Sequence, residues 1–179
     1  MLSRTFLTQA KRSFHSSRVA SIKVGDRIPD VEVQGSSPAE THKTGELLAS
    51  KKRAILFGVP GAFTPGCTKD HLPGYIKKAD ELKAKGVDFI GCVAVNDAFV
   101  MTAWGKSVGN EGEVTLLADP AGELAKALDL NFDATGVLGN HRYKRFAAVV
   151  EGGVVKQLFV EPDNTGLNVS LAENVIKQL

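Results

Sequence analysis

Two continuous apolar runs constrain the fold of this chain more than any other feature. Residues 53–59 read RAILFGV and residues 87–95 read VDFIGCVAV. Each run has the length of a strand and lacks polar alternation, which is typical of strands buried on both faces of a sheet. Between them, Cys67–Lys85 carries apolar side chains at helical spacing, with Pro73 placed to kink the helix and Gly86 placed to end it. The two strands and this helix predict a parallel βαβ unit.

The rest of the chain continues this alternation of strands and helices. After a short antiparallel start in residues 22–35, VTLLAD (114–119) predicts a third strand, and residues 145–162 predict a hairpin around Gly152-Gly153. Further helices are expected from an Asn96 or Asp97 cap to Trp104, from Pro120 to Leu130, and over residues 170–179. This order predicts an α/β fold with a mixed central β-sheet flanked by helices, and a thioredoxin-like arrangement fits it.

The first 21 residues differ from the rest of the chain in charge. All of their charged side chains are basic, namely Arg4, Lys11, Arg12 and Arg18. An Arg- and Ser-rich N-terminus without acidic residues is typical of a mitochondrial or plastid transit peptide. The stretch RSFHSS is similar to the Arg-x-Phe-x-x-Ser pattern of two-step processing in the mitochondrial matrix, which would leave Ile22 first. We therefore expect a mitochondrial transit peptide over 1–21 and a matrix protein formed by 22–179. A disordered basic tail is the alternative.

Charge and composition exclude several classes of function. Removal of the four basic residues changes the formal net charge from +2 to −2, so nothing basic remains to indicate a nucleic-acid partner. No run approaches the ~18 apolar residues that cross a bilayer, so no membrane partner is expected.

Two cysteines without a C-x-x-C pair exclude a disulfide scaffold, a zinc ribbon and a thioredoxin-type dithiol. Four histidines show no metal-ligand spacing, and we expect each to be solvated or locally hydrogen-bonded: His15, His42, His71 and His141. The residues therefore give no reason to expect a metal site.

The stretch VPGAFTPGCTKDHLPG (59–74) places a single cysteine, Cys67, where the first parallel strand passes into its helix. This is the carboxyl end of a strand, where open α/β sheets bind ligands. A thiol reacts as its thiolate, and a helix N-terminus commonly favours an anion by only about 0.3–1 kcal/mol. A hydroxyl donor and a cation are therefore needed as well. Thr64 is placed to supply the first, and Arg142 or Arg145 the second.

The residues around Cys67 resemble a known family. Pro60, Thr64 and Cys67 match the peroxiredoxin signature Pro-x-x-x-Thr-x-x-Cys, and FGVPGAFTPGCTKDHLPG is similar to the type II, or peroxiredoxin-5, subgroup. The segments VNDAFV, LLADP, KRF and EPDNTGL also resemble family segments, so the similarity runs from about Ile22 to Leu179.

The resemblance implies a thiol peroxidase. Its peroxidatic thiolate attacks the distal oxygen of hydrogen peroxide or a small alkyl hydroperoxide, releases water or an alcohol and becomes a sulfenic acid. The residues implied are Cys67, Thr64, Arg145 and Pro60 for catalysis, and Pro65, Gly66, Thr165 and Gly166 for binding substrate. Pro60 and Pro65 are expected to shield the thiolate from water. Arg142 is expected to be a surface or interface cation, or to assist Arg145. No metal, haem or flavin is implied.

The second cysteine, Cys92, lies inside the apolar run FIGCVAV and is predicted to be structural. Members of the subgroup that resolve internally carry a cysteine in a segment like TGLTCSLAP, whereas this chain reads TGLNVSLAE, with Val169 at that place. The resemblance therefore implies reduction by an external thiol, either glutaredoxin with glutathione or thioredoxin. It also suggests a non-covalent homodimer.

Two other functions use the same residues. A peroxide sensor, redox relay or chaperone would pass oxidation from the Cys67 sulfenic acid to a partner. A cysteine hydrolase would need a histidine base, and His71, four residues after Cys67, is the near candidate.

Overall fold

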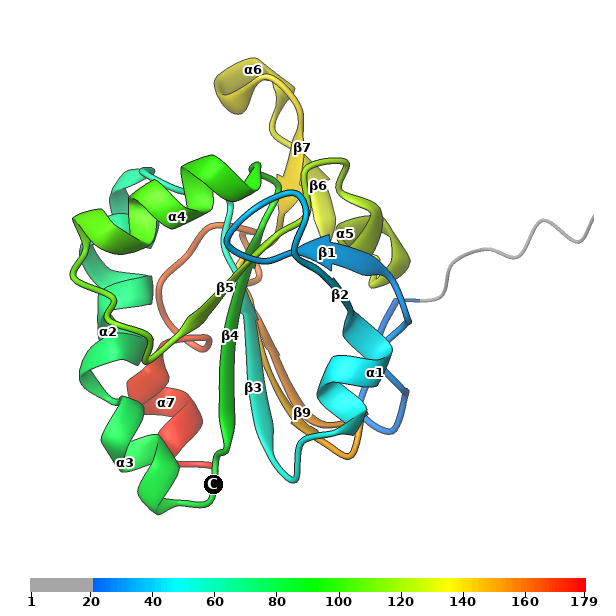
Figure 1. The fold of residues 1–179 in the computed structure, drawn as a ribbon, viewed down its shortest axis with the longest axis vertical. Coiled ribbons are helices and arrows are strands. Elements are labelled where there is room, and N and C mark those ends of the chain that lie inside the picture. The colour runs from blue at the N-terminus through cyan, green and yellow to red at the C-terminus, as the bar shows by residue number, and fades with distance from the viewer. Residues whose placement is uncertain (1–20) are drawn as a thin grey trace, which may run out of the picture.

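The frame of the protein is a seven-stranded mixed sheet in the order β2-β1-β5-β4-β3-β8-β9 (Figure 1). The structure is a computed structural model that describes residues 21–179. Its strands are β1 (Glu32–Gln34), β2 (Thr41–Lys43), β3 (Ala54–Gly58), β4 (Phe89–Ala94), β5 (Thr115–Ala118), β8 (Phe146–Glu151) and β9 (Val154–Val160). The central strands β3, β4 and β5 pair in parallel, whereas the pairings β1–β2, β1–β5, β3–β8 and β8–β9 are antiparallel.

Helices cover both faces of this sheet. They are α1 (Thr44–Ala49), a π-helical turn η1 (Cys67–His71), α2 (Leu72–Lys77), α3 (Ala79–Ala84), α4 (Ala98–Ser107), α5 (Glu123–Ala127), α6 (Thr135–Leu138) and α7 (Ala172–Ile176). In Figure 1 α2, α3, α4 and α7 lie on one side of the sheet, and α1 and α5 lie on the other. The predicted α/β architecture with a mixed, helix-flanked sheet is confirmed.

The central strand β3 contributes to the core on both faces. Ile55 and Phe57 pack in the cluster under α2, α3, α4 and α7, whereas Ala54 and Leu56 pack in the cluster under α1 and α5. All five residues of the strand are buried. The absence of polar alternation in residues 53–59 thus has the predicted cause, because neither face of this strand meets water.

The single helix predicted from Cys67 to Lys85 is instead three pieces. This segment begins with η1, in which the Leu72 N–H donates to the Cys67 carbonyl five residues earlier. The helices α2 and α3 that follow are separated at Lys78 (φ −99°, ψ 5°). Pro73 lies in the first turn of α2, the helix directly after η1, and it cannot donate to the carbonyl four residues earlier. The irregular turn η1 therefore lies just before Pro73, where a proline distorts a helix.

Helix boundaries elsewhere differ modestly from those predicted. The helix after β4 is capped by Asp97, whose Oδ1 accepts the Val100 N–H at 2.9 Å, and it extends beyond Trp104 to Ser107. The last helix is shorter than the amphipathic segment 170–179 and comprises only α7. These ends depend on local hydrogen bonds that the hydrophobic pattern does not specify.

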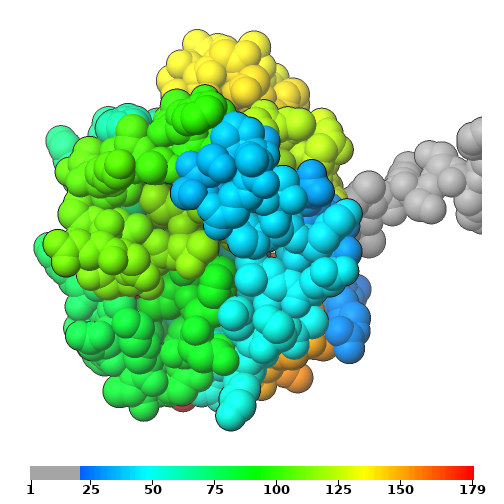
Figure 2. Space-filling view, in the orientation of Figure 1, coloured from blue at the N-terminus to red at the C-terminus, as the bar shows by residue number. Residues whose placement is uncertain are grey.

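A small projecting unit was not predicted. Strands β6 (Asn131–Asp133) and β7 (His141–Tyr143) pair with each other and carry α6 between them. This segment, yellow in Figure 2, forms a knob at the top of the molecule. The Tyr143 hydroxyl anchors its base, because it donates to Asp119 Oδ2 at 2.7 Å inside the core.

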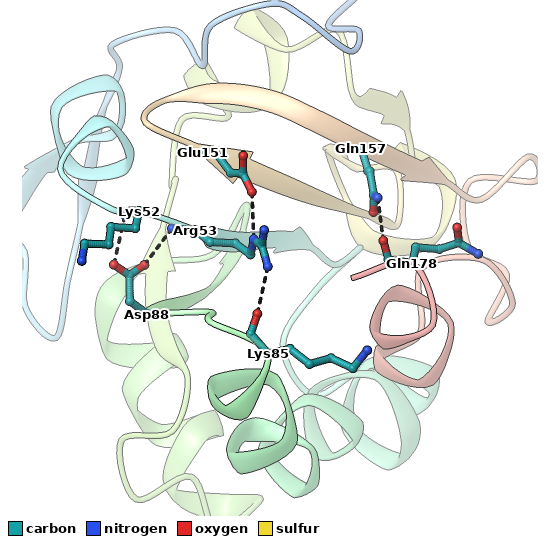
Figure 3. A network of polar contacts seen from close by, with 7 residues as sticks. All are labelled: Lys52, Arg53, Lys85, Asp88, Glu151, Gln157 and Gln178. Atoms are coloured by element: carbon teal, nitrogen blue, oxygen red, sulfur yellow. Dashed lines mark hydrogen bonds and ion pairs between the residues drawn. The ribbon is translucent and has the colours of Figure 1, made fainter.

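Polar contacts tie together the opposite end of the sheet, where β3 and β4 begin (Figure 3). Asp88 accepts the backbone N–H groups of Lys52 and Arg53, and the Arg53 side chain donates to Glu151 Oε1 at 2.8 Å and to the Lys85 carbonyl at 2.8 Å. These contacts join the starts of β3 and β4 to the end of β8. They are structural, and they lie at the edge of the sheet away from Cys67.

Within residues 21–179 no helix is both long and apolar enough to cross a bilayer. The transit peptide predicted over 1–21 falls almost entirely outside the described residues. The domain predicted from Ile22 begins with an ordered contact, since the Ile22 N–H donates to the Leu128 carbonyl at 3.0 Å.

Two glycines test the packing of this core. A methyl group on Gly58 would overlap the ring of Phe146, whereas one on Gly74, in α2, would meet no atom within 4 Å. We predict that Gly58→Ala lowers the free energy of unfolding by about 1–3 kcal/mol through overpacking. Gly74→Ala should raise it by about 0.5–1 kcal/mol because alanine favours a helix. Urea denaturation measures both values, and equal effects would contradict the packing described here.

Candidate active site

Cys67 is the first residue of η1 and is fully buried. The loop before it is held by several contacts: the Thr64 N–H donates to the Gly61 carbonyl, the Ala62 N–H donates to Asn96 Oδ1 at 3.0 Å, and Phe63 has a positive φ of 61°. A non-glycine residue in this region is uncommon and marks a backbone that its surroundings fix. The loop therefore delivers Cys67 to the start of the helix in one defined position.

The hydroxyl of Thr64 does not make the predicted contact with the sulfur. Thr64 Oγ1 donates to the Gly61 carbonyl at 2.9 Å, and a hydroxyl has only one proton to donate. The Thr64 side chain does not cap η1 either, because Gly66 occupies the N-cap position and no side chain accepts a capping hydrogen bond there. In this structure Thr64 shapes the loop, and its backbone carbonyl accepts the Thr68 N–H.

Arg145 is the arginine that reaches the sulfur. Its Nη1 donates to Cys67 Sγ at 3.3 Å, its Nε donates to the Thr165 carbonyl at 3.1 Å, and the side chain is only 3% exposed. Strand register explains the approach, because Gly58 at the end of β3 pairs with Phe146 at the start of β8. A residue just before β8 therefore lies beside the loop that follows β3.

His71 completes the contacts of this guanidinium. Its Nδ1 lies 3.2 Å from Arg145 Nη1, and its Nε2 lies 3.1 Å from the Ser170 carbonyl. A guanidinium can only donate and a carbonyl can only accept, so Nδ1 accepts, Nε2 carries the proton and the ring is neutral. Burial, together with the charge of Arg145, lowers the pKa of His71 to about 3.

This environment corrects two expectations about His71. The ring is fully buried and is bonded to a residue far along the chain, so it is neither solvated nor locally bonded. It also cannot serve a hydrolase as a general base at neutral pH, because both ring nitrogens are engaged and its affinity for a proton is low. His71 follows Cys67 by four residues, or about one helical turn, and this spacing indicates that both side chains can face the same partner, which is Arg145.

Aromatic rings close the inner side of the site. Phe57 and Tyr75 stack with centroids 4.0 Å apart, and the His71 ring meets both of them edge-on. The Tyr75 hydroxyl donates to the Ser170 carbonyl at 2.8 Å, and burial raises its pKa. The Ser170 carbonyl thus accepts from both the histidine and the tyrosine.

Arg142 has a different place from the one predicted. It is neither a free surface cation nor a second donor to the sulfur: Nη1 lies 3.4 Å from both the Pro60 carbonyl and Asn96 Oδ1, and Nη2 donates to the Leu138 carbonyl at 3.2 Å. These bonds fasten the loop before Cys67 to α6. Sequence reasoning missed Asn96 as the shared acceptor, because the loop before Cys67 and the segment of Arg142 come near Asn96 only in the fold.

The other predicted site residues lie on the loop before Cys67 and in the segment after β9. Pro60 and Thr165 line a mostly apolar hollow of ≈ 330 Å³ together with residues of β6 and α6. Gly66 lies against the arginine, since a Cβ there would be 3.2 Å from Arg145 Nη2. The Gly166 N–H donates to Asp163 Oδ1, and Pro65 is exposed at the surface.

Cys92 lies in the same core cluster as Cys67. Burial raises the pKa of the Cys92 thiol, a charge on Cys67 raises it further, and Arg145 opposes the shift. Both cysteines therefore belong to the core on the same face of the sheet. The Cys92 thiol is nevertheless held in its protonated form, which is a poor nucleophile. Among the described residues there is no cluster of three or more metal-ligating His, Cys, Asp or Glu side chains.

Comparison with known proteins identifies the family. The Redoxin family model matches residues 23–176. Peroxiredoxin-2E-2, chloroplastic, of Oryza sativa subsp. japonica is 46% identical over 172 residues, which cover 92% of this chain and 75% of that protein. The chain belongs to the peroxiredoxin family. Peroxiredoxins are thiol peroxidases with an antioxidant role, and this general activity applies to the protein described here.

Solved peroxiredoxins share its fold. The crystal structure of reduced Prx3 in complex with H₂O₂ from Vibrio vulnificus has a TM-score of 0.81 and 44% identity, and the match covers 88% of this chain and 98% of that one. Peroxiredoxin 5 from Alvinella pompejana has a TM-score of 0.75 and 39% identity, with 88% and 99% covered. The thioredoxin-like arrangement expected from the order of elements is confirmed.

The predicted mitochondrial location is wrong on these comparisons. Peroxiredoxin-2E-2 of rice and peroxiredoxin-2E of Arabidopsis thaliana are named as chloroplastic, and a relative from Schizosaccharomyces pombe is named as associated with the peroxisomal membrane. The error has a physical cause: Arg- and Ser-rich leaders without acidic residues are common to mitochondrial and plastid targeting. These residue types therefore do not distinguish one organelle from the other.

The neutral, buried His71 makes stability depend on pH. The unfolded chain binds a proton at this histidine below about pH 6.5, but the folded protein does so only near pH 3. Protons therefore favour the unfolded state, and the free energy of unfolding falls as the pH drops through this window. Between pH 7 and pH 5 we predict that this residue alone costs the protein about 2 kcal/mol.

The matched variant is His71→Gln, which keeps hydrogen-bonding groups but does not titrate. Urea denaturation of both proteins at pH 7 and pH 5 isolates the effect, because His42 and His141 are present in both. A pH dependence of the same size in the variant would show that His71 is not held neutral.

Proposed function

We propose that Cys67 is the peroxidatic residue of this peroxiredoxin and that it reduces hydrogen peroxide and small alkyl hydroperoxides. The observation that carries the proposal is the 3.3 Å contact between Arg145 Nη1 and Cys67 Sγ at the start of η1. A buried guanidinium favours the thiolate and offers a donor to the oxygen that leaves. The complex of the Vibrio vulnificus relative with H₂O₂ supports the choice of substrate.

The reaction transfers two electrons from sulfur to the peroxide. The Cys67 thiolate attacks the distal oxygen, the O–O bond breaks, and the departing oxygen takes up a proton and leaves as water or an alcohol. Cys67 is left as a sulfenic acid. Arg145 is placed to stabilise the developing charge, and Thr64 and Pro60 act through the loop that fixes the position of the sulfur. Pro65, Gly66, Thr165 and Gly166 are proposed to form the mouth through which the peroxide enters.

An external thiol is proposed to restore the enzyme. Val169 cannot resolve the sulfenic acid, and the buried Cys92 thiol is held protonated. A reductant thiol therefore condenses with the sulfenic acid to give a mixed disulfide and water, and a second thiol releases Cys67. Glutaredoxin with glutathione, or thioredoxin, supplies these two thiols. A sensor or relay would use the same sulfenic acid, and sustained peroxide consumption with a reductant separates turnover from relay.

A non-covalent homodimer is proposed on the resemblance to the type II subgroup. It is supported by large apolar side chains exposed next to the site, among them Phe63 on the loop before Cys67 and Phe99 in the first turn of α4. Sedimentation of the reduced protein would show a single monomeric species if this proposal is wrong.

Replacement of each cysteine tests the assignment. We predict that Cys67→Ser abolishes peroxide consumption with every reductant, because an alcohol at this position has no comparable nucleophilicity. Cys92→Ser, the matched control, should keep most of the activity, since its thiol only fills space in the core. Equal loss in both variants would contradict the proposed role of Cys67.

Thiol mapping after one equivalent of peroxide gives an independent check on the same proposal. The expected product carries a sulfenic acid or a glutathione adduct on Cys67, with Cys92 still a free thiol. A Cys67–Cys92 disulfide that forms as fast as the enzyme turns over would show that the second cysteine resolves the first.

We also propose that residues 1–21 are a cleaved leader, without assigning the organelle. The support is the absence of acidic residues before Asp26 and the ordered contact made by Ile22. Mass measurement of protein from its native source should then give an N-terminus near Ile22. A mature chain that begins at Met1 would refute the proposal.

A further inference from the structure

The segment from Thr165 to Ser170 supplies both carbonyl groups on which the proposed site rests. The Thr165 carbonyl accepts from Arg145 Nε at 3.1 Å, and the Ser170 carbonyl accepts from His71 Nε2 at 3.1 Å. Yet the segment contains no helix or strand. Something other than secondary structure must therefore fix the positions of these two acceptors.

The buried carboxylate of Glu161 holds the Asn168–Ser170 end of this segment, whereas Asp163 Oδ1 accepts the N–H groups of Thr165 and Gly166 at the other end. Glu161 Oε1 accepts three bonds, from the Asn168 N–H at 2.8 Å, the Ser170 N–H at 3.0 Å and the Ser170 hydroxyl at 2.7 Å. Glu161 is 1% exposed and follows directly on β9, and its backbone N–H donates to the Arg145 carbonyl at 2.9 Å. One carboxylate oxygen thus ties the segment to the sheet beside the arginine.

Arg145 depends on this arrangement because no carboxylate holds it directly. Among the described residues, the ion pairs with nitrogen and oxygen within 4.0 Å do not include Arg145. Its acceptors are the sulfur, the His71 ring and the Thr165 carbonyl. Two of these three are positioned by the Thr165–Ser170 segment, one of them through His71.

We propose that Glu161 is a positioning residue for the reaction of Cys67 with peroxide. It acts on Arg145 through the Ser170 carbonyl and the His71 ring, and the inference rests on the proposed role of Cys67. The second oxygen, Oε2, is buried without a partner in the described chain and lies towards Gly166, where a Cβ would be 3.1 Å away. All three bonds of the carboxylate are made by Oε1, and bonds to a charged acceptor are about twice as strong as neutral ones.

The test uses Glu161→Gln in the full protein. Glutamine keeps the size and one acceptor oxygen, but it removes the charge. A side chain displaced by about 1 Å near the chemistry can cost up to about a hundredfold in rate. We expect the second-order rate constant for Cys67 oxidation by hydrogen peroxide to fall between about tenfold and a hundredfold. Stopped-flow fluorescence can follow the step, because the only tryptophan, Trp104, donates to Thr68 beside Cys67 at 3.0 Å.

The matched control is Glu151→Gln. Glu151 is also a carboxylate at the end of a strand, but it accepts from Arg53 at the far edge of the sheet (Figure 3). Its loss should leave the peroxide rate within about twofold of the wild-type rate, because surface ion pairs contribute little and act locally.

Coupling to Arg145 separates positioning from a general loss of structure. In an Arg145→Lys background the forked donor is already gone, so adding Glu161→Gln should slow the reaction by less than about twofold. A full additive loss in that background would overturn the inference, as would a wild-type rate in Glu161→Gln alone. If Cys67→Ser keeps its activity, the proposed function itself fails. If that variant is inactive and Glu161→Gln is normal, only this inference fails.

Discussion

The guanidinium of Arg145 is the group on which the rest of the site depends. It is buried, and a buried cation is costly unless its donors are satisfied. Its partners come from two separate stretches of chain: the sulfur of Cys67 and the ring of His71 from η1, and the carbonyl of Thr165 from the segment after β9. Each partner must be in place for the cation to be tolerated in the core. The position of the Cys67 sulfur is therefore tied to the packing of the core around this cation.

The sheet brings these stretches together through the direction of its strands. Because β8 runs antiparallel to β3, its first residue lies beside the last residue of β3, and the loop to Cys67 and the residue Arg145 share one edge. The parallel partner β4 ends at the same edge, where Asn96 accepts from the loop and from Arg142. Fixed contacts at the opposite edge hold the starts of β3 and β4 against the end of β8. The end of the sheet beside Cys67 is therefore supported by strands whose opposite ends are held together by these contacts.

The sequence predicted the parts of this architecture that depend on local patterns. The unbroken apolar runs identified β3 and β4, and the spacing of Pro60, Thr64 and Cys67 located the loop. It did not predict the roles of His71, Asn96 or Glu161, because their partners lie far along the chain and are brought near only by the sheet. The hydroxyl of Thr64 was assigned to the sulfur from its spacing alone, whereas a nearer acceptor, the Gly61 carbonyl, takes its proton. The unit β6–α6–β7 has strands too short for a periodic signal, and it was missed for that reason.

The π-helical turn at Cys67–His71 sets the direction in which the sulfur points. A π-turn is an α-helical turn with one residue inserted, and each residue of an α-helix turns the chain by about 100°. If the bond from Leu72 closed on the fourth residue instead of the fifth, everything before the turn would rotate by about that angle relative to α2. The thiol would then leave the side of the helix that faces Arg145, although every side chain in the segment would be unchanged. The direction of the sulfur thus depends on the number of residues in this turn as well as on their chemistry.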